Sequence, residues 1–117
     1  MRLAHLALAV RDQDRSRRFY ETYFGFGVGP SQRYEDGVLI IRDAEGFDLA
    51  LGETRGMGEL PPFVHFGFRC AEPDDVRALL ERVMTDGVSV VERFDEPDFV
   101  SFKCLDPDGY IVEVYWE

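Results

Sequence analysis

Apolar residues in the first half of the chain recur in patterns that predict strands and one helix. Residues 3–10 are almost continuously apolar, as in a strand buried on both faces. Asp12 is a residue type that caps helix starts, and Gly25 stands just beyond the expected helix end near residue 23. The predicted core face of this helix carries Phe19, Tyr23 and Phe26. Three short strands should follow, at residues 30–34, 38–42 and 47–52.

The second half of the chain repeats this order of elements. A strand is predicted at residues 63–70 and a helix at 73–85, with Pro73 in the first helical position and Gly87 beyond the end. The last strands should lie near residues 89–94, 99–105 and 110–116. Between the halves, residues 54–61 contain Gly and Pro without periodicity, which indicates a linker.

Matching turns and histidines indicate that the two halves are copies. Asp43 opens a Gly-containing turn that is echoed at Asp106, an offset of 106−43=63. The chain's two histidines, His5 and His65, are offset by 65−5=60. We therefore predict an α+β fold of two tandem βαβββ modules, about residues 1–53 and 62–117. Their mixed sheets should form a curved cup with the helices on the outer face, and the 117 residues should make a single domain, 1–117.

The alternation of side chains along each strand predicts which residues share the open face of the sheets. If the bulky residues pack on the helices, His5, His65 and Glu113 point to the other face, and Phe63 adds apolar lining there. Two imidazoles and a carboxylate suit a divalent transition metal with positions left for substrate, and zinc, iron, manganese, nickel and cobalt all fit such ligands. The alternative is that the histidines only pack or hydrogen-bond, as a lone strand histidine usually does.

Composition narrows the classes of partner. The net charge of −10 argues against nucleic acid and against an anionic membrane surface, and it is compatible with a cationic ligand. Cys70 and Cys104 are too few for a disulfide framework, so we expect reduced, buried packing residues in apolar strands. We see no signal peptide and no apolar run that could cross a bilayer, and we expect a cytoplasmic location.

Three segments resemble the vicinal oxygen chelate superfamily: residues 5–12, residues 16–20 and, most specifically, the Asp-Pro-Asp-Gly turn and glutamate-bearing strand of residues 105–113. This superfamily includes glyoxalase I, fosfomycin-resistance thiol transferases, extradiol ring-cleaving dioxygenases and bleomycin-resistance proteins. The resemblance implies that His5, His65 and Glu113 match the family's metal ligands. Aligning the two Gly turns places Ala50 opposite Glu113 (50−46=4 and 113−109=4), so the fourth ligand of glyoxalase I is missing. The set is more similar to those of the fosfomycin-resistance transferases and the dioxygenases, and the short chain favours the smaller enzymes.

The resemblance also implies partners and roles. In small members of the family the site forms between two chains, which implies a homodimer with His5 from one subunit and His65 with Glu113 from the other. Lys103 matches a substrate-contacting residue of the fosfomycin-resistance enzymes, and Tyr115 flanks Glu113. The candidate catalytic residues are therefore Glu113, Lys103 and Tyr115. Ala50 stands where glyoxalase I has its fourth ligand, so another group would have to act as the base. The candidates for this base are Asp48, Lys103, Tyr115 and metal-bound hydroxide.

Two functions remain open from the sequence. One is a metal-dependent lyase, transferase or dioxygenase that acts on a small molecule with neighbouring oxygens. Antibiotic-resistance enzymes are included in this class. The other is a metal-free protein that binds or sequesters an antibiotic, in the manner of bleomycin resistance. The two retained histidines and Glu113 favour the enzyme.

Overall fold

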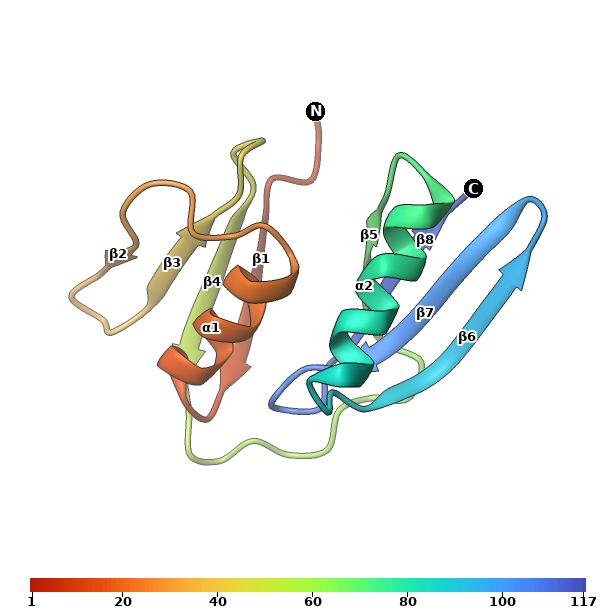
Figure 1. Ribbon diagram of the computed structural model, residues 1–117. Helices are drawn as coiled ribbons and strands as arrows, with labels where there is room; N and C mark the ends of the chain where they lie inside the picture. The colour runs from red at the N-terminus through yellow and green to blue at the C-terminus, as the bar shows by residue number, and fades with distance from the viewer. The chain divides into compact units, whose positions relative to one another are not determined.

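The computed structural model describes residues 1–117 as two compact units, Met1–Glu59 and Leu60–Glu117. Each unit has one helix and a four-stranded mixed sheet, in the chain order strand, helix, three strands (Figure 1). The predicted α+β class and its two βαβββ modules are confirmed. Neither helix combines the length and the apolar composition that a membrane crossing requires.

The first unit begins with β1 (His5–Val10), followed by α1 (Gln13–Tyr23). Its other strands are β2 (Gln32–Arg33), β3 (Leu39–Arg42) and β4 (Asp48–Glu53). In the sheet the order is β1-β4-β3-β2, with β1 parallel to β4 and the other pairs antiparallel. Asp12 caps α1 as predicted, because its carboxylate accepts a hydrogen bond from the Arg15 amide at 3.0 Å.

The second unit has the same topology. It contains β5 (His65–Arg69), α2 (Pro73–Thr85), β6 (Val90–Glu96), β7 (Phe99–Leu105) and β8 (Ile111–Trp116), with sheet order β5-β8-β7-β6. β5 is shorter than the predicted strand 63–70. Phe63 has a φ of 72°, which breaks the extended backbone, so the strand starts two residues later, at His65.

Each sheet is buried on the face that meets its helix. In the first unit Leu8 and Val10 of β1 are buried, and in the second unit Val112 and Val114 of β8 are buried, as the alternation predicted. The core face of α1 is rotated from the prediction, because Tyr20 is fully buried and Tyr23 only partly so. The remaining buried positions of α1 explain the rotation: Gln13, Ser16 and Phe19 lie on the same stripe as Tyr20.

Gln13 ties the start of α1 to the sheet. Its side-chain amide donates hydrogen bonds to the Gly37 carbonyl at 2.6 Å and the Leu51 carbonyl at 2.7 Å. Its side-chain oxygen accepts a bond from Arg33 Nη1 at 2.6 Å. With only 4% of its surface exposed, this polar residue has its donors and its acceptor satisfied inside the fold.

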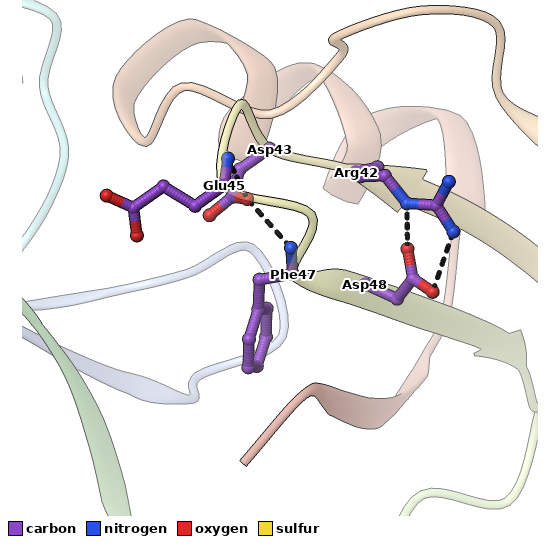
Figure 2. A network of polar contacts seen from close by, with 5 residues as sticks. All are labelled: Arg42, Asp43, Glu45, Phe47 and Asp48. Atoms are coloured by element: carbon purple, nitrogen blue, oxygen red, sulfur yellow. Dashed lines mark hydrogen bonds and ion pairs between the residues drawn. The ribbon is translucent and has the colours of Figure 1, made fainter. Parts of the chain in front are cut away.

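The turn before the last strand of each unit has the same hydrogen bonds in both copies. Asp43 Oδ1 accepts bonds from the Glu45 and Phe47 amides at 2.9 and 2.8 Å (Figure 2). Asp106 Oδ1 accepts the corresponding bonds from the amides of Asp108 and Tyr110, both at 2.9 Å. The sequence echo therefore reflects one turn geometry used twice.

Both cysteines are free thiols. Cys104 is buried in β7, and desolvation with the nearby Asp106 charge raises its pKa to about 11. The prediction for Cys70 was wrong in part, because this residue follows the end of β5 and is only half-buried. Desolvation raises the pKa of Cys70 as well, so neither thiol is set up as a nucleophile.

Candidate functional site

His65 and Glu113 meet on the face of the second sheet that α2 leaves uncovered. β5 and β8 are parallel, with His65 paired to Ile111 and Gly67 paired to Glu113. The histidine and the glutamate are therefore diagonal neighbours on one face. His65 Nε2 lies 3.4 Å from Glu113 Oε2, and the two side chains are 23% and 19% exposed. The structure thus brings together two of the three predicted metal ligands.

Gly67 leaves the space beside Glu113 open. A Cβ atom at this position would lie 3.3 Å from the Glu113 carbonyl oxygen and 3.4 Å from a ring carbon of Tyr115, on the face that carries the site. A larger side chain there would fill the space across which the His65 imidazole reaches Glu113. The lack of a side chain at Gly67 therefore makes room for the pair.

The second ring nitrogen of His65 is held by the backbone. His65 Nδ1 lies 2.7 Å from the Phe63 carbonyl oxygen. A carbonyl only accepts hydrogen bonds, so Nδ1 carries the hydrogen and donates it. In the neutral imidazole, Nε2 is then the nitrogen with the free lone pair, and it is the one that faces Glu113.

Phe63 is not placed as predicted. It lies outside β5, the residue is 84% exposed, and it does not line the sheet face as a strand residue would. Its ring instead packs edge-on against the His65 imidazole, with centroids 5.3 Å apart and planes at 88°. The error has a physical cause, since a strand that is interrupted by a positive φ loses the alternation on which the prediction relied.

The donor pair fits a transition-metal ion. Metal–nitrogen and metal–oxygen bonds of about 2.0–2.2 Å place two ligands of one tetrahedral ion roughly 3.4 Å apart, and the observed separation is 3.4 Å. No group of three or more His, Cys, Asp or Glu side chains lies together in position to hold a metal ion. His5 lies at the start of β1 in the first unit, and its place in the ligand set stays a prediction.

Lys103 lies directly across the β7–β8 pair from Glu113. Its ammonium group donates to Glu92 Oε1 at 2.7 Å, and its side chain is only 19% exposed. The hydrogen bond and charge of Glu92, with a further contribution from the Glu113 charge, raise the pKa of Lys103. A lysine with a raised pKa is a fixed positive charge near neutral pH and a poor general base. Glu92, its partner, was not identified from the sequence.

Tyr115 is half-buried, two residues beyond Glu113 on the same face of β8. Its register partners are Arg69 on β5 and Ser101 on β7. Ser101 is 2% exposed, and its hydroxyl has no hydrogen-bond partner, which is unusual for a buried polar group. Nothing in the sequence singled out this serine, because a single Ser inside an apolar strand has no motif around it.

The first unit carries different residues at the equivalent positions. Ala50 pairs with Ala7 and Ile40, just as Glu113 pairs with Gly67 and Lys103, so the register makes Ala50 the counterpart of Glu113. No carboxylate stands at that position to serve as a fourth ligand or base.

Asp48, the register partner of His5, is engaged by Arg42. The guanidinium group donates to the two carboxylate oxygens at 2.6 and 3.0 Å (Figure 2). This hydrogen bonding, aided by the charges of Arg42 and His5, lowers the pKa of Asp48. A carboxylate that is already paired and ionised is a weak proton acceptor, which counts against Asp48 as the base.

Residues 2–114 match the model of the glyoxalase/bleomycin resistance protein/dioxygenase superfamily. The chain belongs to this superfamily. The resemblance carried by the opening histidine strand and the Asp-Pro-Asp-Gly turn is therefore confirmed. Among curated proteins, the uncharacterized protein PA2024 of Pseudomonas aeruginosa is 34% identical over 121 residues, which cover 95% of this chain and 85% of the relative.

Two solved structures illustrate the superfamily fold. A possible glyoxalase from Bacillus cereus is 28% identical, with a TM-score of 0.81 and 97% of each chain covered. A mutant of the fosfomycin resistance protein FosX from Listeria monocytogenes, complexed with Mn(II) and 1S,2S-dihydroxypropylphosphonic acid, is 20% identical. Its TM-score is 0.77, and the match covers 96% of this chain and 86% of that one. At this identity the likeness to FosX concerns the fold alone.

Proposed function

We propose that the protein is a metal-dependent enzyme that binds a small molecule through two neighbouring oxygens, in the manner of the glyoxalase, fosfomycin-resistance and dioxygenase members of its superfamily. The observation that carries this proposal is the His65–Glu113 pair, whose Nε2 and Oε2 atoms are 3.4 Å apart. The Nδ1 bond to the Phe63 carbonyl, which leaves the Nε2 lone pair for a ligand, supports it. The Mn(II) complex of the related fold supports a divalent ion, among which zinc, iron, manganese, nickel and cobalt suit these ligands.

The residues around the pair suggest how a substrate is handled. A divalent ion bound there would stabilise negative charge that develops on a substrate oxygen. Lys103, held protonated by Glu92, is suited to neutralise a second anionic group of the substrate. The Tyr115 ring lies beside Gly67 on the same face. Ala50 offers no base, and Asp48 is engaged by Arg42. Proton abstraction of the glyoxalase I kind is therefore disfavoured. Attack on an epoxide, or ring cleavage of a catechol, is favoured instead.

The first experiment is metal analysis of untagged protein, followed by calorimetric titration with Zn²⁺. We expect a full equivalent of metal per chain, and loss of binding in His65→Ala and Glu113→Gln. The matched control is Asp95→Asn, since Asp95 is a carboxylate of the same unit that pairs with Arg77 on the surface. Stoichiometric metal retained in His65→Ala would contradict the assignment. Turnover is then screened with thiol adducts of methylglyoxal, with fosfomycin and with catechols.

We further propose a homodimer in which His5 of the partner subunit completes each ligand set. An isologous two-fold interface is the commonest way to pair identical chains. The test mixes His5→Ala and His65→Ala chains after unfolding and refolding them together. If the site is shared, one of the two sites in each mixed dimer keeps all its ligands, and metal binding partly returns. If all ligands come from one chain, the mixture binds no more metal than its components.

The alternative function is sequestration of a cationic antibiotic without metal. The net charge of −10 is the observation in its favour, since it attracts cations. This function predicts tight binding of a bleomycin-type glycopeptide in the presence of EDTA and an unchanged melting temperature on adding metal. The enzyme proposal predicts a higher melting temperature with metal.

A further inference from the structure

Lys103 lies between two carboxylates in one row of the second sheet. β7 separates β8 from β6, and the register places Glu113 on one side of Lys103 and Glu92 on the other. Directly opposed side chains on antiparallel strands have Cβ atoms about 4.5–5.5 Å apart, so the lysine can reach either carboxylate. Its ammonium pairs with Glu92 at 2.7 Å, while the carboxylate of Glu113 faces His65 Nε2 at 3.4 Å. Lys103 and Glu113 therefore contact neighbours on opposite sides.

An irregularity in β6 places Glu92 beside Lys103. Val90 pairs with Cys104. A continuous ladder would then pair Val91 with Lys103 and direct Glu92 to the face that α2 covers. The register instead shifts between Val90 and Glu92, so that Glu92 is the partner of Lys103. An extra residue of this kind re-aims the side chains that follow it, and such bulges are frequent next to active sites.

Contacts of the next residues show on which side Glu92 lies. Arg93 Nη1 contacts the Met84 sulfur of α2 at 3.6 Å, and Asp95 pairs with Arg77 of α2 at 2.8 Å. Side chains alternate along a strand, so Glu92 lies on the opposite face, which is the one that carries His65 and Glu113.

The charges of this row are not a requirement of the fold. At the equivalent positions the first unit carries uncharged residues, namely Ala50, Ile40 and Gln32. The Lys103 side chain is only 19% exposed, and withdrawing an ammonium group from water has a cost that a partner must offset. A role at the His65–Glu113 pair accounts for charges that the scaffold does not need.

We propose that Glu92 is a positioning residue: it binds the Lys103 ammonium on the side away from Glu113 and so keeps the Glu113 carboxylate free to hold an ion together with His65. Without Glu92, the ammonium would move to Glu113, occupy its lone pairs and repel a metal cation. The location of the ammonium is a property of the protein alone. The effect on metal affinity rests on the proposed function.

The first measurement locates the ammonium in isotope-labelled, metal-free protein. NMR coupling across a hydrogen bond, between Lys103 Nζ and a glutamate carboxyl carbon, identifies the carboxylate that the lysine binds, and crystal structures of the same proteins give the location independently. The wild type should show Glu92 as the partner, and Glu92→Ala should show Glu113. The matched control is Glu96→Ala, because Glu96 lies on the same face of β6, four residues or about 13 Å further along. This control should keep Glu92 as the partner.

Titration with Zn²⁺ then gives a double-mutant cycle. Glu92→Ala should raise the Kd by roughly 10–100-fold, the usual effect of losing a residue that supports a metal ligand. Lys103→Met removes the ammonium, so Glu92→Ala should have a much smaller effect in that background. Glu96→Ala measures how much the loss of one negative charge from β6 contributes by itself.

An ammonium that does not move to Glu113 in Glu92→Ala would overturn the proposal. An equal rise in the Kd with and without the Lys103 ammonium would overturn it too, because Glu92 would then act through its charge alone. If the ammonium moves as expected and the wild type binds no zinc, the positioning of Lys103 by Glu92 stands and the proposed metal function is refuted.

Discussion

Replacing Gln13 with alanine should destabilise the first unit by about 2–3 kcal/mol. The change removes the bonds to the Gly37 and Leu51 carbonyls and the bond from Arg33. Each such bond contributes about 0.5–1.5 kcal/mol net, so three give roughly 1.5–4.5 kcal/mol, and the better helix propensity of alanine returns a few tenths. The buried position, 4% exposed, keeps water from replacing the lost partners.

Two further Gln13 variants separate the role of the donor from that of volume. Gln13→Met keeps the size of the side chain but loses all three bonds. It should therefore be destabilised slightly less than Gln13→Ala, which also leaves a cavity. Gln13→Glu keeps the bond from Arg33 but turns the donor into a second acceptor that faces two carbonyls, and it should also be destabilised near neutral pH. The assay is urea unfolding followed by circular dichroism. A loss below about 0.5 kcal/mol for Gln13→Ala, the range of neutral surface changes, would refute this reasoning.

Three other predictions follow from local contacts. Asp106→Ala should cost about 2 kcal/mol in urea unfolding because two turn amides lose their acceptor, whereas Asp106→Asn, which keeps a carbonyl oxygen, should cost less. Cys104, buried with a pKa of about 11, should react with iodoacetamide far more slowly than the half-buried Cys70, and equal rates by mass spectrometry would contradict this. Arg42 lowers the pKa of Asp48. The free energy of unfolding of wild type should therefore exceed that of Asp48→Asn near neutral pH, and the difference should disappear as the pH falls below about 4. A difference that grows on acidification would show the opposite sign.

Periodicity and turn chemistry were sufficient to predict the elements of both modules. Asp12 and Pro73 marked the helix starts because capping depends on the residue type at one position. The alternation in β5 and β8 placed His65 and Glu113 on one face, and a parallel register then made them neighbours. These features depend on the residue types within short segments, and those can be read from a single sequence.

Other features depend on geometry that residue types do not specify. The apolar run around Phe63 has the pattern of a continuous strand, and no residue type in it indicates the positive φ of Phe63. The partnership of Lys103 with Glu92 requires the register of β6 against β7, which shifts between Val90 and Glu92. A rotation of α1 by roughly 60°, the angle between two residues three apart at 100° per residue, moves Tyr20 into the core in place of Tyr23. The role of His5, which lies at the start of β1, stays a prediction.

The two sheets share one register, so each position on one sheet has a counterpart on the other. Four positions on the uncovered face correspond one to one: Ala7 with Gly67, Ala50 with Glu113, Ile40 with Lys103 and Gln32 with Glu92. None of the four first-unit residues belongs to the buried core of its module. The residues at these four positions can therefore be exchanged between the two halves of the chain without changing the buried core of the first module.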